Sequence, residues 1–550
     1  MNNYTTPSRN ATPNEYTFNE PPPTPSASGS SRGAGQSSAG VAPRTSNMDD
    51  DDDEMPPAPN PGSNTAGLVT MTRPMYSKKN VALTADSVTV VVELQAAVSP
   101  AVREGLDLVV VLDVSSKDNV GRMKTAMQFV INKLTPTDRL CIVTFADGAT
   151  RHNQLRCMTA AAHKDLEAIV GGLKLATRGG GGANIKAGMD AALAVFTSRK
   201  HTNGRTTNIF LLSNGVQSST TGGGGGDARL VDVGNVAVFT FGIGKETDNN
   251  AVLSTIARKS AGGTFSTVQD GADLTTPLAE LLGGVLTVVA QDVKLTLKPN
   301  RKEKHLDTMV VAPGLDYQQT TTDDGKITIQ FGALFSGETR KVVINMKLLP
   351  TKEEEDEDED EEEAEEEDAK LADAKLSYMR QGDKDSGKAP RLIQIQRTPH
   401  PAAAAPAGGD RHSNTSSVVV VLELARRKHA ETIRAVRQLA DAGNLDVAKD
   451  TVMDALNGLE NIMVEEEGQK LVVDNLRDEL RQLLALMDNK DLYSRRGHPY
   501  ALACETSHAH QRFAAKGDNS RSFATYRMDN HRDEATQFVK DLISHQGRRH

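Results

Sequence analysis

The stretch Leu106-Asp107-Leu108-Val109-Val110-Val111-Leu112-Asp113-Val114-Ser115-Ser116-Lys117 decides the fold class of this chain. A mainly apolar run ends in a loop with one acid and two hydroxyls, and a helical pattern of apolar residues then continues to Leu134. Such a loop is expected at the carboxyl end of a buried parallel strand, and open α/β sheets bind their ligands at these ends. The stretch therefore predicts an α/β fold and also the edge of the sheet where a site would lie.

Between residues 104 and 268, short apolar runs alternate with helical patterns. Strands that are apolar on both faces need cover on both faces, and helices in the connections supply it. We therefore predict a doubly wound, mostly parallel α/β sheet over 104–268. The expected strands are 108–112, 140–145, 207–212 and 236–241, and the expected helices are 121–134, 163–173, 185–198 and 250–260.

The two segments that flank this unit, 65–103 and 269–350, contain runs typical of β-strands. The later runs alternate polar and apolar residues, which is the pattern of antiparallel strands. Ahead of them we expect one more helix at 274–289. We predict a β-sandwich built from both sides of the α/β unit, to which residues 371–400 can add strands.

Three segments are predicted to lack a packed core because of their composition. Residues 1–64 are rich in Pro, Ser, Gly, Asn and Thr and are expected to form a disordered N-terminal region. Residues 351–370 form an acidic linker, and residues 401–415 form an Ala/Pro linker.

Apolar residues at helical spacing over 416–490, separated by short connections, predict a small C-terminal helical bundle. His429 lies on the first of these stripes, and we interpret it as a core or edge histidine rather than a ligand. Residues 491–550 are expected to form a basic polar tail with one last short helix. We interpret His508 and His510 as solvated residues of that tail.

The formal net charge of −10 is concentrated in two acidic runs. Fifteen acids lie in 353–368 and six in 49–54, and removing these 21 negative charges leaves about +11 for the rest of the chain. We interpret the runs as solvated spacers, with binding of a basic partner as the alternative. Nucleic-acid binding is not predicted, because the basic residues are dispersed and aromatic residues are few.

Three cysteines, Cys141, Cys157 and Cys504, form no spaced pairs, so neither a disulfide framework nor a zinc cross-brace is predicted. The first residues do not have the pattern of a signal peptide. No apolar run reaches the length of about 18 residues that a membrane span needs. We therefore expect a cytoplasmic protein, with a nuclear location as an alternative.

At its strand-end loops the chain resembles the von Willebrand factor A family, whose sheet is Rossmann-like. Among its members, the plant proteins that often carry a RING finger and act as ubiquitin ligases are most similar. The resemblance covers roughly residues 65–500, and the order of the matching loops makes it specific. The RING finger itself is missing, so ligase activity does not follow. The resemblance rests on Val109–Ser115, Gly181–Gly188, Ile209–Gly215, Phe239–Gly244, Ser260–Phe265 and Gly283–Val293.

The resemblance implies a site for Mg²⁺ or a similar ion, held by oxygen atoms from three loops. Only Asp113 and Ser115 of the expected ligands are present. Lys117 replaces a hydroxyl, Ala183 replaces a threonine, and Asn214 replaces an acid. We therefore expect a degenerate metal site without an ion or other cofactor, with Mg²⁺ binding as the alternative. Lys117 would then either pair with Asp113 or point into solvent.

These features predict a non-catalytic protein-interaction module that binds a protein partner through its strand-end loops. Residues Ser116, Asp118, Asn184 and Gly215 are the expected contacts. The alternative is a component of a ubiquitination pathway, an adaptor or a competitor that works beside a RING-bearing relative. We expect no enzyme activity, because no catalytic set of side chains is suggested.

Overall fold

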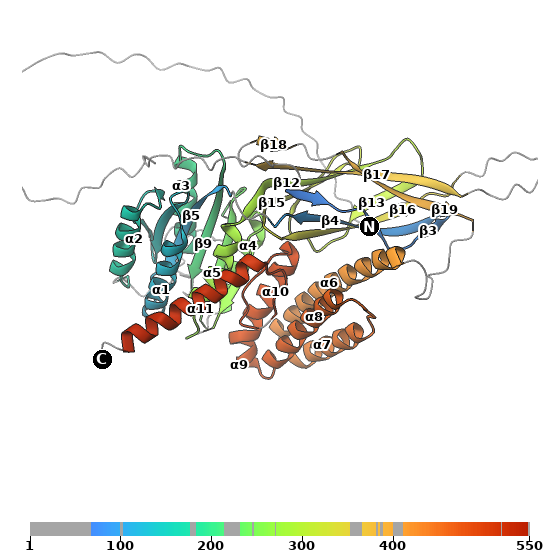
Figure 1. The fold of residues 1–550 in the computed structure, drawn as a ribbon. Helices are drawn as coiled ribbons and strands as arrows, with labels where there is room; N and C mark the ends of the chain where they lie inside the picture. The colour runs from blue at the N-terminus through green and yellow to red at the C-terminus, as the bar shows by residue number, and fades with distance from the viewer. Residues whose placement is uncertain are drawn as a thin grey trace, which may run out of the picture. The chain divides into compact units, whose positions relative to one another are not determined.

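The computed structural model describes the chain from Leu68 to Gly547, with gaps (Figure 1). The predicted disordered region at 1–64 lies outside the described residues, as do most of the acidic linker and residues 401–410 of the Ala/Pro linker. The described ranges are 68–98, 103–176, 183–213, 231–244, 247–269, 271–351, 366–380, 383–385, 389–399, 411–518 and 520–547.

The quoted stretch forms β5 (Gly105–Asp113), whose residues are all buried. β5 lies inside a sheet of order β11-β10-β9-β5-β6-β7, in which β8 also pairs with β6. The first five strands of this order are parallel, and β7 and β8 run antiparallel to β6. The further strands are β6 (Arg139–Phe145), β7 (Ala149–Arg151), β8 (Arg156–Cys157), β9 (Arg205–Ser213), β10 (Ala237–Ile243) and β11 (Phe265–Val268).

Helices cover both faces of this sheet. Alternate side chains of β5 point to opposite faces, so apolar residues on both faces need cover. Val110 and Leu112 pack against the layer that includes α1, α2 and α5, and Val109 and Val111 pack against α3 and α4. The predicted doubly wound α/β sheet is therefore confirmed. The helices are α1 (Lys117–Lys133), α2 (Ala160–Gly172), α3 (Ile185–Ser198), α4 (Thr247–Lys259) and α5 (Thr275–Val285).

The flanking strands form two sheets whose facing apolar side chains share one core. The predicted sandwich built from both sides is confirmed, since β4, which precedes the α/β unit, pairs with β16, which follows it. One sheet has the order β1-β4-β16-β13 with β2 on β4, and the other has the order β14-β15-β12-β17-β19-β3 with β18 on β17. The strands are β1 (Val69–Met71), β2 (Met75–Tyr76), β3 (Asn80–Ala82), β4 (Asp86–Ala96), β12 (Val288–Pro299), β13 (Leu306–Val311), β14 (Gln318–Thr321), β15 (Ile327–Phe335), β16 (Thr339–Leu348), β17 (Glu367–Arg380), β18 (Asp383–Asp385) and β19 (Arg391–Thr398).

Two boundaries differ from the prediction. The helix expected at 274–289 ends at Val285, and Val288 already begins β12. The run Leu286–Val289 is compatible with either a buried helix or a buried strand. In the structure, backbone pairing with β15 stabilises the strand. The acidic linker expected at 351–370 is shorter, because β17 begins at Glu367 and pairs with β19.

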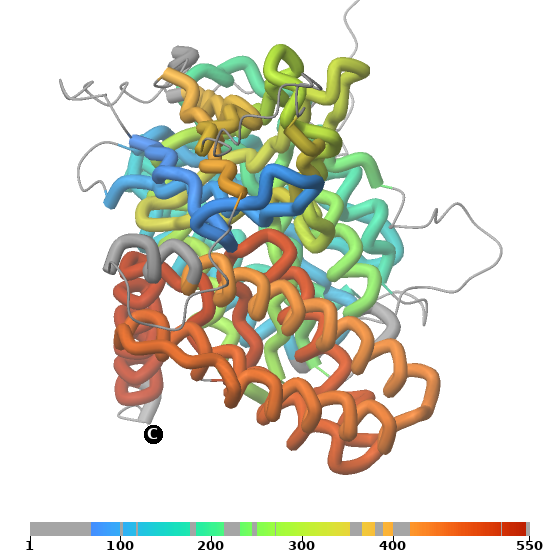
Figure 2. Tube along the Cα trace, turned by 90° about the vertical axis from the view of Figure 1, so that its right-hand side faces the viewer, coloured from blue at the N-terminus to red at the C-terminus, as the bar shows by residue number. Residues whose placement is uncertain are grey.

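A C-terminal helical region follows, with three long helices that share an apolar core. They are α6 (Arg411–Asp441), α7 (Leu445–Glu460) and α8 (Glu467–Leu486). Figure 2 shows this orange-to-red layer lying beside the strands of the sandwich. Val420 of α6 is buried against Val91 and Val343 on the outer side of the β4–β16 sheet.

The basic polar tail expected at 491–550 is wrong for most of its length, although its expected last short helix is confirmed as part of a longer one. The chain instead forms α9 (Lys490–Leu492), a π-helical turn η2 (Tyr493–Gly497), α10 (His498–His510) and α11 (Tyr526–Gly547). α10 packs on α4 through Leu502 and Ala503, and α11 packs on α5 and, through Phe538 and Phe129, on α1. Most side chains of α10 are polar or small, so the sequence indicates a surface segment although the whole helix except its first residue is buried. In the described residues no helix combines the length and apolar character that crossing a membrane requires.

Candidate functional site

Asp113, at the carboxyl end of β5, is the centre of the predicted site, and its side chain is fully buried. Its Oδ1 accepts hydrogen bonds from the Ser115 backbone N–H at 3.0 Å and from the Ser115 hydroxyl at 2.6 Å. Its Oδ2 accepts a hydrogen bond of 2.7 Å from the hydroxyl of Ser213. β5 and β9 pair in parallel with Leu112 opposite Leu212, so the next residue of each strand reaches the same level. The first and third loops therefore meet at this carboxylate.

The second loop reaches the same edge but offers few oxygen atoms. Ala183 is fully buried in the apolar core between the sheet and α3. The side-chain oxygen of Asn184 caps α3 by accepting a 3.0 Å hydrogen bond from the Ala187 N–H. The backbone N–H of Asn184 donates to the Ala146 carbonyl at 2.7 Å, which ties this loop to the end of β6. Asn184 is therefore placed by the fold as a helix cap.

The other predicted residues are only partly described. Ser116 is half-buried and precedes α1, and its side chain makes no capping hydrogen bond. Lys117 and Asp118 begin α1, but their side chains lie outside the description. Asn214 and Gly215 fall outside the described residues altogether. The pairing of Lys117 with Asp113 therefore stays a prediction.

Sequence reasoning missed Ser213 as a member of this site. A signal was present, because Ser213 is the last residue of an apolar strand and directly precedes the position of the expected third-loop acid. Among the described residues, the loops bring together one carboxylate and the hydroxyls of Ser115 and Ser213, and these groups bond to one another. Divalent hard cations prefer several oxygen ligands with carboxylates among them. Because Ala183 adds no oxygen and the Asn184 side-chain oxygen serves as a cap, the described set fits such an ion poorly.

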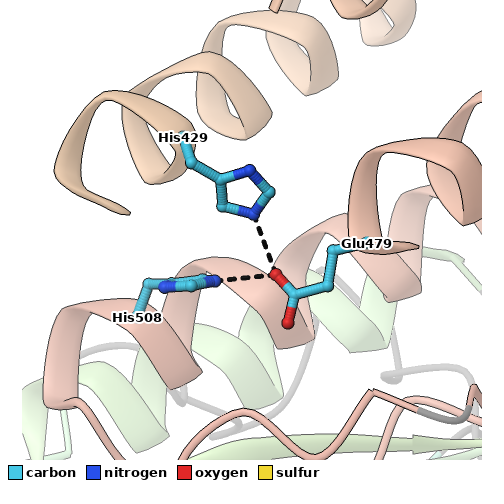
Figure 3. A group of neighbouring side chains, drawn as sticks. All are labelled: His429, Glu479 and His508. Atoms are coloured by element: carbon cyan, nitrogen blue, oxygen red, sulfur yellow. Dashed lines mark hydrogen bonds and ion pairs between the residues drawn. The ribbon is translucent and has the colours of Figure 1, made fainter. Parts of the chain in front are cut away.

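A second cluster of functional groups lies where α6, α8 and α10 meet, and no sequence pattern predicted it (Figure 3). Glu479 Oε2 lies 2.8 Å from His429 Nε2 and 2.7 Å from His508 Nε2. Its other oxygen, Oε1, accepts hydrogen bonds from Lys516 at 2.7 Å and from Ser520 and Ser522 at 3.0 and 2.9 Å. The interpretation of His508 as a solvated residue is therefore wrong, because packing of α10 buries it with its two partners.

The protonation of this cluster follows from its burial. Burial by itself would raise the pKa of Glu479, but the nearby Lys516 ammonium and the two histidines hold that pKa well below its usual value. Burial lowers the pKa of His508 to about 4, although Glu479 acts in the opposite direction. Glu479 is thus ionised and His508 is neutral near pH 7. A neutral imidazole has one N–H, and on His508 it donates from Nε2 to Glu479.

Two histidines and a carboxylate can also hold a transition metal, and these three ligand atoms lie within 4.8 Å of one another. Two neighbours argue against a metal here. Lys516 already balances the charge of Glu479, so a divalent ion would add two uncompensated positive charges to a buried site. Binding through Nε2 would also move the His508 proton to Nδ1, which faces the Arg426 guanidinium at 3.4 Å, another donor. The cluster is better explained as a hydrogen-bonded joint between three helices.

Comparison with known families and structures agrees with this fold. A sequence profile described as "von Willebrand factor type A domain" matches residues 107–280. A second profile, "VWA / Hh protein intein-like", matches residues 470–537, which include α10 and most of α8. No curated protein matches the chain.

Two solved structures share the fold over most of the chain at low sequence identity. A von Willebrand factor type A protein from Catenulispora acidiphila superposes with a TM-score of 0.55 and 19% identity, over 74% of this chain and 89% of that protein. The ArnB paralog VWA2 from Sulfolobus acidocaldarius gives a TM-score of 0.50 and 15% identity, over 80% and 97%. The sheet order, the three strand-end loops and the profile match lead to one conclusion: residues 107–280 of this chain form a von Willebrand factor type A (VWA) domain.

Proposed function

We propose that this chain is a non-catalytic protein-interaction module whose VWA domain binds a protein partner through its strand-end loops without a divalent ion. VWA domains are commonly interaction modules, and these loops form the ligand-binding edge of an open α/β sheet. The observation that carries the proposal is the environment of Asp113. Its carboxylate is buried and accepts hydrogen bonds from Ser115 and Ser213, while Ala183 leaves the second loop without a hydroxyl.

The charges of the loops support an ion-free site. A divalent ion needs negative ligands to offset its charge, and the sequence provides Asp113 but an amide at 214. Lys117 adds a positive charge to the sequence of the first loop, at the position where the family has a hydroxyl ligand. A carboxylate and an ammonium in one loop are neutral together, so the loops do not require an ion for charge balance. In this proposal the partner contacts Ser116, Asp118, Asn184 and Gly215 directly.

The test is partner capture with and without chelator. Full-length chain serves as bait for an extract of its source, the captured protein is identified, and its affinity is then measured with purified components. Ser116→Trp places a bulky side chain on the loop edge and should abolish binding. Glu167→Trp, at an exposed position in the middle of α2, is the matched control and should bind normally. EDTA should leave the affinity unchanged, and loss of binding in EDTA would contradict the proposal.

A finer proposal concerns the identity of the partner. The resemblance over residues 65–500 supports a RING-bearing VWA protein as the partner, with this chain acting as adaptor or competitor and having no ligase activity of its own. Purified chain mixed with ubiquitin, activating enzyme and conjugating enzyme should transfer no ubiquitin. Co-precipitation with a RING-bearing relative would support the idea. Ubiquitin transfer by the chain alone would overturn it.

A further inference from the structure

A groove of about 1320 Å³ lies at the edge of the α/β sheet opposite to the strand-end loops. One wall consists of the first residues of β9, the approach to β10 and the ends of α3 and α4. The other wall belongs to the sandwich and includes β12 and β15. Residues with amide and hydroxyl side chains line it on both sides, among them Asn208, Thr206, Gln291 and Gln330. A groove with this lining suits a polar ligand.

The first source of charge near the groove is a buried carboxylate with three guanidinium groups around it. Asp107 is fully buried and accepts hydrogen bonds from Arg139 at 2.8 and 2.7 Å. Arg205 donates to the same carboxylate at 2.6 Å and Arg199 at 2.8 Å. Buried charges are normally matched one to one, because an unmatched charge in a medium of low dielectric is costly. Asp107 cannot balance all three of these cations.

Arg199 is the guanidinium of this group that lines the groove and still has N–H groups available for hydrogen bonds to a ligand. Within the described residues, the Arg199 guanidinium hydrogen-bonds only to Asp107, through Nη1. Its Nε and Nη2 atoms form an edge on which two N–H groups point in parallel. This edge is the fork that binds carboxylate or phosphate oxygens in pairs. Its side chain is 16% exposed, whereas that of Arg139 is completely buried.

The remaining lining keeps the groove positive. Among the described residues, five cationic and three anionic side chains line it, a difference of two positive charges. Arg258 is matched by Asp316 at 2.6 Å and Lys294 by Asp292 at 2.8 Å, whereas on the wall that contains Arg199 the single Asp107 carboxylate is shared by Arg199, Arg205 and Arg139. On this wall the hydroxyl of Thr206 is buried and has no hydrogen-bond partner in the described part of the chain. A hydroxyl and a guanidinium edge are both suitable donors to an oxyanion.

We propose that this groove is a second binding site, separate from the strand-end loops, for a small polar anion that carries phosphate or carboxylate groups. The Arg199 fork binds one oxyanion group, and the hydroxyl and amide side chains of both walls bind the rest of the molecule. Since the two walls belong to the α/β domain and to the sandwich, a bound anion also bridges these two parts.

Calorimetric titration of the full chain tests the site with three defined probes at constant ionic strength: inorganic phosphate, tripolyphosphate and citrate. We expect saturable binding of at least one probe, and the preferred probe distinguishes a phosphate ligand from a carboxylate ligand. Arg199→Gln removes the fork while Arg139 and Arg205 still hold Asp107, so the fold is retained. It should weaken binding about tenfold, as expected for loss of one bidentate charged contact.

Arg481→Gln is the matched control, because it removes an arginine that is 60% exposed on α8 and has a carboxylate partner of its own. It should leave the affinity unchanged. Thermal unfolding of each variant without probe shows whether the fold is intact. Lys294→Gln, on the opposite wall, should weaken binding by a smaller factor. The proposal is overturned if no probe binds saturably, or if Arg199→Gln and Arg481→Gln have the same affinity as the unaltered chain.

Discussion

The hydroxyl of Ser213 donates a 2.7 Å hydrogen bond to the fully buried carboxylate of Asp113, 100 residues earlier in the chain. This bond joins the end of β9 to the end of β5, the two central strands of the sheet. Ser115 occupies the other oxygen of the same carboxylate. In the VWA family the acid and the hydroxyl at the positions of Asp113 and Ser115 would bind a metal ion. Here they stabilise one another.

The first prediction concerns stability at this position. Ser213→Ala removes one hydrogen bond to a charged group and should lower the free energy of unfolding by about 1–2 kcal/mol. Asp113→Ala leaves three donor groups, the Ser115 N–H and the hydroxyls of Ser115 and Ser213, without their acceptor in a buried place and should cost about 3 kcal/mol. Urea unfolding followed by circular dichroism measures both. Equal free energies of unfolding for Asp113→Ala and the unaltered chain would show that this carboxylate does not stabilise the strand-end loops.

The second prediction is a gain of metal binding. The triple variant Lys117→Ser, Ala183→Thr and Asn214→Asp restores the two hydroxyls and the acid that the family uses. It should bind Mg²⁺ or Mn²⁺ with a dissociation constant of about 0.1–1 mM, the range of weak oxygen-ligand sites. The unaltered chain should give no heat of binding. Ala183→Thr alone is the control for strain, because Ala183 is fully buried.

Strong Mg²⁺ binding by the unaltered chain would contradict the ion-free proposal. Its loss in Asp113→Ala would then place that ion at the strand-end loops. If both the unaltered chain and the triple variant fail to bind, the three departures do not by themselves explain the loss of the site.

A third prediction concerns the joint at Glu479. Glu479→Gln keeps the size of the side chain but leaves the buried Lys516 ammonium without its counter-charge, so it should cost about 3–5 kcal/mol. The double variant Glu479→Gln, Lys516→Met removes both charges and should be more stable than the single variant. Ser522→Ala loses one hydrogen bond and should cost about 1 kcal/mol. Thermal unfolding ranks the three variants, and a double variant that is weaker than Glu479→Gln would argue against charge pairing as the source of stability.

The fourth prediction is a pH dependence with a definite sign. Burial lowers the pKa of His508 to about 4, against an ordinary value near 6.5 in the unfolded chain. Below pH 6.5 the unfolded state takes up a proton that the folded state does not, so stability falls as the pH drops from 6.5 towards 4. His508 alone should contribute a loss on the order of 2 kcal/mol at pH 5.

The pH effect can be separated from other acid transitions with a matched variant. His508→Gln carries no titrating group at this position, so its free energy of unfolding should change less between pH 7 and pH 5 than that of the unaltered chain. His510, whose pKa burial also lowers to about 4, titrates in the same range and remains in both proteins. The slope should therefore be reduced but not abolished. An unchanged slope in His508→Gln would exclude His508 as a source of the effect.

The sequence alone was sufficient for the architecture around β5. The run Leu106–Leu112 is apolar at every position but Asp107, which requires cover on both faces, and the alternation of such runs with helical patterns leaves few other folds. The sandwich also followed from local pattern, since its strands alternate with the period that one buried face imposes. Asp113 and Ser115 were found for the same reason, because their place at the end of a strand is a local property.

Only the tertiary structure decided which polar groups meet. Glu479 lies 50 residues from His429 and 29 from His508, and no periodicity connects positions on three separate helices. α10 contains so many polar residues that its sequence indicates a solvated tail, yet hydrogen bonds to other elements allow it to be buried. The hydropathy of a segment indicates the free-energy cost of removing its polar groups from water. The hydrogen-bond partners that offset this cost come from distant parts of the chain, and they are identified only in the packed structure.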